Sequence, residues 1–378
     1  PNIGVDRPEG QRHDWRMRRA RSSPPGAAAL LAAGGRAAAP ETAPRGAAAR
    51  PAIVTGTPLI PATWALAGKA VTVAGREAMV VSAHPLASAV GVLILRQGGN
   101  AVDAAVAVGF ALAVVLPEAG NIGGGGFLLY REAGGAVHAL DYREMAPAAA
   151  RRDMYLDSTG AATDRSLTGH LAAGVPGSVA GLYAAWRAHG RLPWAAVLAP
   201  AIALARYGHV IDSTRVADIE WEAERLDSFP ASRAQFLPGG APPAVGSLWT
   251  QPDLARTLQL ISDSGPGVFY RGQIADLIVE EMARGGGLIT REDLARYEAK
   301  WRTPFTLAYR GPTIYSMPPA SSGGVTLGLI LNILDQYPAR ARDGGGLDRA
   351  GLLHDEARQG PHAPRDRAGP LARPAGGA

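Results

Sequence analysis

The segment AVDAAVAVGFALAVVL, residues 101–116, is apolar on nearly every face, with Asp103 as its one charged residue. A helix of this kind must be surrounded by protein or by lipid. It is shorter than the roughly 20 apolar residues that cross a bilayer, and Asn100 and Pro117 bound it. We therefore predict a helix buried in a layered fold, capped by Asn100, and no membrane span. Asp103 is expected to hold a buried hydrogen bond and no catalytic role.

Four consecutive glycines, residues 123–126, follow this helix and precede the apolar run FLLYRE. A phosphate-binding loop needs a strand before its glycines and a helix after them, because the helix N-terminus supplies the amide donors. Here the order is helix and then strand, and no lysine lies nearby. The pattern disfavours a nucleotide site and leaves open a backbone that passes unusually close to another part of the chain.

Helix and strand patterns are mixed along the middle of the chain, without regular alternation. The predicted strands are AMVVSAHP at 78–85, a hairpin built from FLLYRE and VHALDYREMAP, and two extended pieces around the turn at 310–312. The predicted helices cover 85–97, 101–116, a segment after the 174–177 turn, 193–206, 252–264, 273–284, a short helix capped by Thr290 and Asp293, and one after Ser321 and Ser322. This mixture predicts the α+β class with packed layers.

The two ends of the chain differ in composition from its middle. Residues 1–67 are rich in Ala, Arg, Pro and Gly without a sustained period, and residues 339–378 contain four large apolar residues, all Leu. Such segments cannot bury enough surface to offset their ordering entropy, so both are expected to be disordered around a folded domain at 68–338. The first segment also has a basic start, a short apolar stretch and an Ala-Ala-Ala before Pro40. An export signal and a composition-biased leader both fit that outline.

Charge and residue usage exclude several classes of function. The net charge is +5, but residues 1–50 carry nine Arg against four acidic residues, so the excess lies in the tails. Only Lys69 and Lys300 are lysines, against 36 Arg, which is more typical of a GC-rich genome than of selected phosphate contacts. Nucleic acid is therefore not an expected partner. No cysteine occurs and the histidines lack metal-ligand spacing, so we predict no metal and no cofactor.

Several long motifs, in order, strongly resemble the γ-glutamyltransferase (γ-glutamyltranspeptidase, glutathione hydrolase) family. They are GGNAVDAAVAVGFALAVVLPEAGNIGGGGF, DYREMAP, GVPGSVAGL, HGRLPWAAVLAPAIALA, GGLITREDLARY and YSMPPASSGG. The resemblance covers about residues 75 to 338. It implies an N-terminal-nucleophile hydrolase with an α-β-β-α sandwich, present here only as the large-subunit portion. In that fold, the glycines would let backbone approach backbone at the entry to a central strand.

The resemblance places one substrate contact in this sequence. Arg143, in YREMAP, would bind the α-carboxylate of the γ-glutamyl group, because a guanidinium fork matches a carboxylate with two parallel hydrogen bonds. The alternative is an arginine paired with Asp141 or Glu144 on a solvated strand end. The catalytic nucleophile of the family, a Thr at the N-terminus of a small subunit released by self-cleavage, has no counterpart in this sequence, so no catalytic residue is assigned.

Four other residues could be catalytic by residue type, but a structural role explains each of them at least as well. Ser321 and Ser322 stand where a helix cap is expected, and no His or Asp partner is signalled. His84 and His138 could be acid-base groups, but a lone His near apolar strands is more often a satisfied core residue.

The resemblance therefore predicts part of an enzyme that cleaves γ-glutamyl amides such as glutathione and transfers the γ-glutamyl group to water or amino acids. The expected partner is a small catalytic subunit, made as one proenzyme, and the expected location is periplasmic or secreted, with the cytoplasm left open. A frameshift near residue 340 would explain the change in composition there. A non-catalytic scaffold that binds γ-glutamyl compounds and a related acylase are the alternatives.

Overall fold

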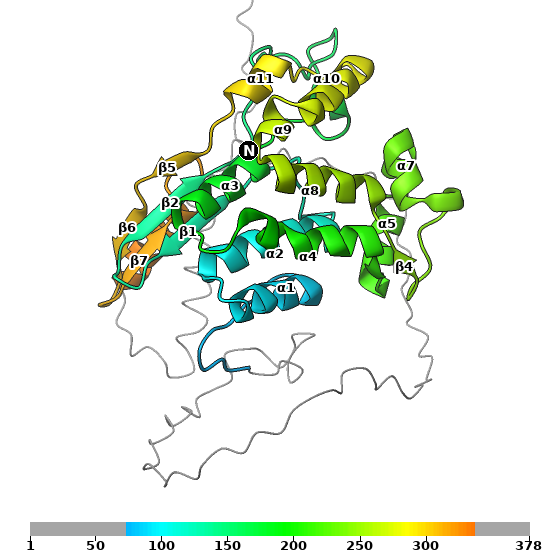
Figure 1. Ribbon diagram of the computed structural model, residues 1–378. Coiled ribbons are helices and arrows are strands. Elements are labelled where there is room, and N and C mark those ends of the chain that lie inside the picture. Colours follow the sequence, from blue (N-terminus) through cyan, green and yellow to red (C-terminus); the bar gives the residue numbers. More distant parts are fainter. Residues whose placement is uncertain (1–72, 337–378) are drawn as a thin grey trace, which may run out of the picture. The chain divides into compact units, whose positions relative to one another are not determined.

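A computed structural model of the chain describes residues 73–336, in which helices and strands are mixed (Figure 1). The predicted leader at 1–67 and the predicted tail at 339–378 lie outside the described residues. None of the helices between residues 73 and 336 combines the length and the apolar character needed to cross a bilayer.

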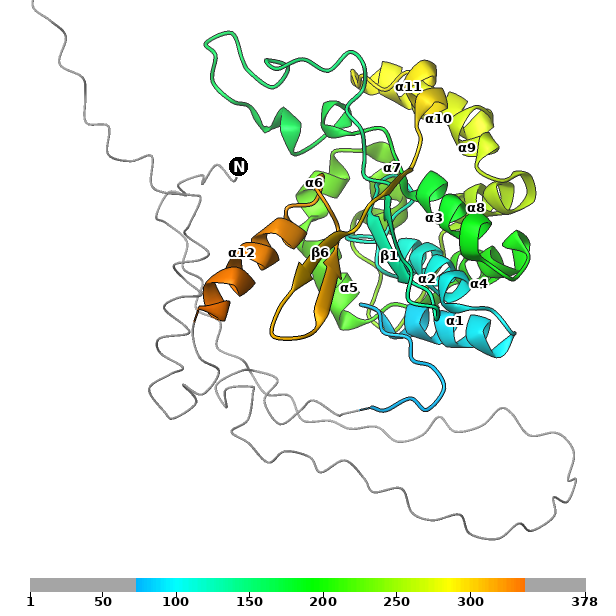
Figure 2. The same ribbon diagram turned by 90° about the vertical axis from the view of Figure 1, so that its left-hand side faces the viewer.

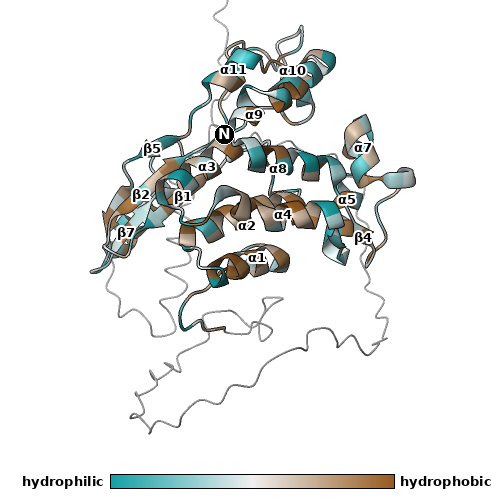
Figure 3. Ribbon diagram, viewed as in Figure 1, coloured by the Kyte–Doolittle hydropathy of each residue, from teal (hydrophilic) through white to brown (hydrophobic). Residues whose placement is uncertain are grey.

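Helix α2 (Ala101–Val115) lies at the centre of the helical layer. Eleven of its residues are buried, and it packs against α1 (Pro85–Arg96), α3 (Ser178–His189) and α4 (Trp194–Tyr207). Helix α8 (Pro252–Ser264) packs on the other side of α4. Figure 3 shows apolar residues concentrated in α1, α2 and α4. The prediction of a buried helix is confirmed.

The N-terminus of α2 explains why its single charge is tolerated. The Asn100 side chain accepts hydrogen bonds from the backbone N–H groups of Val102 and Asp103, and the Asp103 carboxylate accepts one from the Asn100 N–H at 2.9 Å. The carboxylate, fully buried, also accepts from the N–H groups of Arg191 at 3.0 Å and Leu192 at 3.3 Å. Asp103 therefore satisfies backbone donors of its own helix and of the α3–α4 connection.

The main sheet has the order β1-β2-β5 and is antiparallel throughout. Its strands are β1 (Phe127–Arg131), β2 (Val137–Asp141) and β5 (Lys300–Arg302). In the register, Leu140 lies between Leu128 and Trp301, and Leu128 and Leu140 belong to the core shared with the helices. Strands β1 and β2 form the predicted hairpin. Strand β5 was not predicted, because three exposed residues carry no strand pattern.

The remaining described elements lie around these layers. They are η1 (Asp164–Ser166), η2 (His170–Ala172), β3 (His209–Val210), α5 (Ser213–Trp221), α6 (Ala223–Asp227), α7 (Pro230–Phe236), η3 (Pro238–Gly240), β4 (Leu248–Trp249), α9 (Gly267–Tyr270), α10 (Gln273–Gly285), α11 (Arg291–Arg296), β6 (Phe305–Ala308), β7 (Thr313–Ser316) and α12 (Gly323–Asp335). The pairs β3–β4 and β6–β7 form separate two-stranded sheets. Helix α12 lies against β6 and β7 (Figure 2).

One local prediction was wrong, and another was right in a different detail. The run at 78–85 forms no strand, because no strand among the described residues pairs with it, and Val81 is 83% exposed. A strand needs hydrogen-bonded neighbours, which a local pattern does not supply. Ser322 occupies the N-cap position of α12 with helical φ and ψ, and its side chain makes no capping hydrogen bond. The Ser321 hydroxyl accepts from the N–H of Gly323, the first residue of α12, at 3.3 Å, so the predicted serine cap is present and is made by Ser321.

Candidate active site

The end of β2 is held by glycine backbone. Tyr142 exchanges two backbone hydrogen bonds with Gly126, at 3.0 and 3.2 Å. A Cβ at Gly125 would lie 2.5 Å from the Tyr142 carbonyl oxygen and 2.8 Å from the Arg143 Cα. Real Cβ contacts are essentially never shorter than 3.0 Å, so the residue at 125 must lack a side chain. The expected close backbone approach is confirmed, and it occurs beside Arg143.

Helix α3 encloses Tyr142 from another direction. Any Cβ at Gly177 would overlap the Tyr142 carbonyl oxygen, and any Cβ at Gly181 would overlap its ring. The N–H groups of Gly177 and Ser178 also donate to the Gly124 carbonyl, at 2.7 and 2.9 Å. Burial raises the pKa of the Tyr142 hydroxyl. Two glycine segments thus fix the residue that immediately precedes Arg143.

Tyr297 holds the backbone of Arg143 itself. Its hydroxyl donates a hydrogen bond to the Arg143 carbonyl oxygen at 2.9 Å. The ring stacks on Tyr270 at 5.7 Å and 12°, and the Tyr270 hydroxyl donates to the Pro176 carbonyl at 2.9 Å. Burial, followed by the charges of Asp141 and Glu144, raises the pKa of Tyr297 above its usual range, so the hydroxyl stays protonated as a donor.

Arg143 lines a groove of about 190 Å³ at this edge of the sheet. The lining residues are Asp141, Arg143, Glu144, Met145, Tyr297, Glu298, Lys300, Arg302 and Ala320. Sequence reasoning found Arg143 but missed Tyr297, Lys300 and Arg302. These three residues reach the groove because β5 and the turn before it lie beside β2, a pairing that the short segment KWR does not signal.

The Arg143 guanidinium has no carboxylate partner among residues 73–336. Its one described hydrogen bond goes to the Ala320 carbonyl oxygen at 3.4 Å. Asp141, which the sequence offered as a partner, accepts from Arg302 Nη2 at 3.0 Å and Nε at 3.2 Å. It also accepts from the Arg143 backbone N–H at 3.2 Å. The guanidinium is exposed in the groove, where it can bind an anion.

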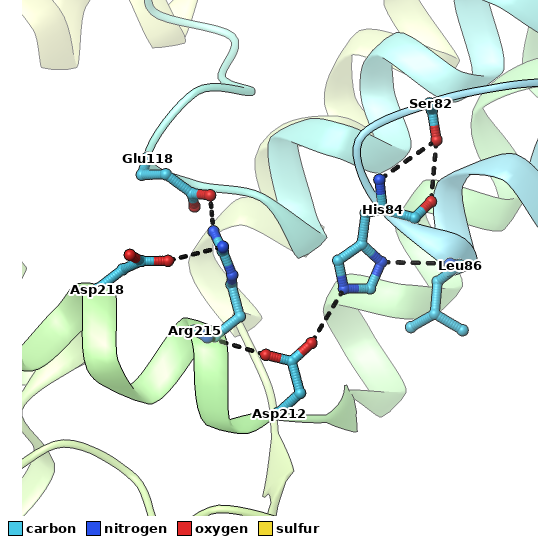
Figure 4. Close-up of polar contacts among 7 residues, drawn as sticks. All are labelled: Ser82, His84, Leu86, Glu118, Asp212, Arg215 and Asp218. Carbon is cyan, nitrogen blue, oxygen red and sulfur yellow. Dashed lines mark hydrogen bonds and ion pairs between the residues drawn. The ribbon is translucent and has the colours of Figure 1, made fainter. Parts of the chain in front are cut away.

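The two histidine candidates do not line this groove. His84 caps α1: its Nδ1 accepts from the Leu86 N–H at 3.2 Å, and its Nε2 lies 4.0 Å from Asp212 Oδ2 (Figure 4). His138 Nε2 lies 2.9 Å from Glu132 Oε1. Both histidines therefore have partners that account for them structurally. Within residues 73–336, no three His, Asp or Glu side chains are arranged to hold a metal ion.

A second charged cluster lies away from the groove, and the sequence did not signal it. Arg215 is 7% exposed and pairs with Glu118 and with Asp218, the latter at 2.7 Å (Figure 4). Glu118 belongs to the loop that leads from α2 to the glycines. We read the cluster as an anchor for that loop, because its charges are paired with one another.

Comparison with known proteins identifies the fold. The family model described as gamma-glutamyltranspeptidase matches residues 87–360. The chain belongs to the gamma-glutamyltranspeptidase family. Gamma-glutamyltranspeptidase from Helicobacter pylori has a TM-score of 0.73 and 42% identity, over 76% of this chain and 84% of that chain. The N-terminal-nucleophile hydrolase fold predicted from the sequence is thereby confirmed, with the large-subunit portion of the family present here.

Curated relatives set the extent of the match. Glutathione hydrolase proenzyme of Escherichia coli (strain K12) is 47% identical over 283 residues, which are 74% of this chain and 49% of the relative. Acylase ACY 1 proenzyme of Pseudomonas sp. (strain V22) is 41% identical over 286 residues, which are 74% of this chain and 51% of that relative. The chain spans about half the length of the curated relatives it matches.

Proposed function

We propose that this chain supplies the substrate-positioning part of a γ-glutamyltransferase, or glutathione hydrolase. Such an enzyme cleaves the γ-glutamyl amide of glutathione and transfers the γ-glutamyl group to water or an amino acid. The observation that carries the proposal is the exposed Arg143 guanidinium. It lines the groove, and it pairs with no carboxylate of the described residues. Membership of the gamma-glutamyltranspeptidase family supports the same assignment.

In the proposed mechanism, Arg143 binds the α-carboxylate of the γ-glutamyl group through two parallel charge-assisted hydrogen bonds. The glycine contacts at Tyr142 and the hydrogen bond from Tyr297 fix the backbone of Arg143, so the bound substrate presents its γ-carbonyl in one position. The Thr nucleophile attacks that carbonyl after its own amine takes up the hydroxyl proton. The tetrahedral intermediate collapses to an acyl-enzyme ester as the amine of the substrate's leaving group departs with the proton that the Thr amine had taken up. Water or an amino acid then attacks the ester.

We propose that this Thr belongs to a small subunit that corresponds to the other half of the relatives' length. Both relatives named above are proenzymes, which fits a nucleophile released by self-cleavage. On this proposal, the 378 residues of this sequence are inactive by themselves, and the site is completed only when the small subunit packs beside the groove. We extend the same proposal to location: an exported protein that acts in the periplasm or outside the cell.

The test compares the chain alone with the chain joined to, or co-expressed with, a matching small subunit. The 378-residue chain should not hydrolyse γ-glutamyl-p-nitroanilide. In the completed enzyme, Arg143→Lys keeps the charge but loses the bidentate fork. One charge-assisted hydrogen bond is worth roughly 1.5–3 kcal/mol, so kcat/KM should fall about tenfold to hundredfold.

The matched control is Arg131→Lys, an exposed arginine on β1 that does not line the groove. It should leave kcat/KM within about twofold of the parent enzyme, since isolated surface changes are small. Self-cleavage of Arg143→Lys should proceed, because it involves the chain's own backbone. Turnover by the isolated chain, or an unchanged kcat/KM in Arg143→Lys, contradicts the proposal. Cleavage of other acyl amides in preference to γ-glutamyl amides would favour the acylase alternative.

A further inference from the structure

Lys300 is a further cation that lines the same groove as Arg143. Lys300 lies directly opposite Asp141 in the antiparallel β2–β5 pair. Opposite residues of such a pair share a face of the sheet, with Cβ atoms about 4.5–5.5 Å apart. Arg143 follows Asp141 by two residues, and both cations line the groove. Residues separated by 157 positions in the chain are thus brought to one recess.

Asp141, the acid opposite Lys300 in the register, does not neutralise it. The Asp141 carboxylate is engaged by two hydrogen bonds from Arg302 and one from the Arg143 backbone N–H, and its side chain is only 10% exposed. No described residue forms a hydrogen bond or ion pair with the Lys300 side chain, which is exposed. Its ammonium is therefore available to a ligand in the groove.

The charges lining the groove fit a ligand with two carboxylates. Arg302 and Asp141 are paired, which leaves Arg143 and Lys300 as the cations without a described carboxylate partner. Glu144 and Glu298 also line the groove, so a ligand with carboxylates alone would meet repulsion there. Glutathione carries two carboxylates, one at each end, and one ammonium. A lysine ammonium is a compact charge on a flexible stem, which suits the mobile far end of a peptide.

We propose that Lys300 forms a second carboxylate subsite, which selects γ-glutamyl compounds whose leaving group carries its own carboxylate. This inference rests on the proposed function and names the substrate class of the same site. Arg143 binds the α-carboxylate common to all γ-glutamyl compounds. Lys300 binds the carboxylate at the other end, which γ-glutamyl peptides have and simple γ-glutamyl amides lack.

The experiment uses the completed enzyme and two substrates, glutathione and γ-glutamylethylamide. Lys300→Gln should raise KM for glutathione about 1.5-fold to fivefold, the range for a solvent-accessible ion pair, with a smaller effect on γ-glutamylethylamide. Lys300→Arg, which keeps the positive charge, should retain most of the preference for glutathione over γ-glutamylethylamide. The difference in KM for glutathione between the parent enzyme and Lys300→Gln should also shrink in high salt, because exposed charges are screened. Arg131→Gln, on the opposite edge strand, is the matched control for loss of a cation. It should not alter the ratio of the KM values for the two substrates.

The outcomes separate the two proposals. If Arg143→Lys impairs both substrates while Lys300→Gln changes neither, or changes both equally, the second subsite is wrong and the proposed function stands. If γ-glutamyl compounds are not turned over, or Arg143→Lys has no effect, the proposed function fails and the subsite fails with it. Self-cleavage of each variant reports that it has folded, so a misfolded variant is not mistaken for loss of specificity. A preference lost in Lys300→Gln and regained in Lys300→Arg supports the inference.

Discussion

At residue 125 a Cβ atom would lie 2.5 Å from the Tyr142 carbonyl oxygen, whereas at Gly123, in the same glycine run, it would meet nothing within 4 Å. Gly125→Ala must therefore displace the backbone that carries Arg143. We expect it to lower the free energy of unfolding by about 2–3 kcal/mol, a typical cost of overpacking. Gly123→Ala should change it by less than about 0.5 kcal/mol. Urea denaturation of the two variants measures the difference, and equal effects would contradict the close-approach explanation.

Arg143 illustrates what single residues reveal at this scale. Its chemistry could be read from the motif, because a guanidinium beside a strand end suits a carboxylate. Its surroundings could not be read. Nothing in the sequence indicated that Arg302 would engage Asp141, or that Tyr297 would hold the Arg143 carbonyl. Both partners lie more than 150 positions away, and only strand pairing brings them close.

At the scale of elements, Asp103 joins the start of α2 to the α3–α4 connection through three backbone N–H donors. Asp103→Ala would leave these buried donors unpaired, each at a cost of about 1–3 kcal/mol. We expect the free energy of unfolding to fall by about 3–5 kcal/mol. Asp253→Ala, an exposed acid in the first turn of α8, is the control and should cost less than about 1 kcal/mol. Thermal or urea unfolding measures both variants. If Asp103→Ala and Asp253→Ala lower the free energy of unfolding by similar amounts, Asp103 serves only as a helix-terminal charge.

Elements that depend on local signals were predicted well, and those that depend on pairing were not. Helix α8 has the predicted bounds, 252–264, and α11 begins at the predicted Thr290–Asp293 capping box. The 78–85 run, by contrast, has strand-type residues but no strand partner among the described residues. Helix caps act within one turn of the chain, whereas a strand requires a neighbour from elsewhere.

At the scale of the folded domain, His84 and His209 bring α1, β3 and α5 together. Their rings meet edge to face at 6.3 Å, and Asp212, the N-cap of α5, lies 4.0 Å from His84 Nε2. Burial lowers the pKa of His84, although Asp212 opposes the shift. Burial, and then the charge of His84, lowers the pKa of His209, whose ring nitrogens have no partner among the described residues. Both rings are therefore expected to be neutral in the folded chain.

These shifts predict how stability depends on pH. Because the folded pKa values lie below the unfolded value of 6.5, the unfolded chain binds more protons as pH falls. The stabilisation is fully present above about pH 6.5 and is lost as pH falls towards the folded pKa values. We expect a lower urea midpoint at pH 5.5 than at pH 7.5. His209→Phe, which removes a buried titratable group, should flatten this dependence, and an unchanged pH slope in that variant would refute the assignment.

The sequence by itself determined the buried helix at 101–115, the hairpin that follows it, the glycines at its entry and the family of the fold, because each depends on residues close together in the chain. It also singled out Arg143. Only the tertiary structure decided which residues surround that arginine. The three-residue strand β5 carries Lys300 and Arg302 to the groove, and it pairs with β2 residues that lie 159 to 163 positions earlier, which no local pattern encodes.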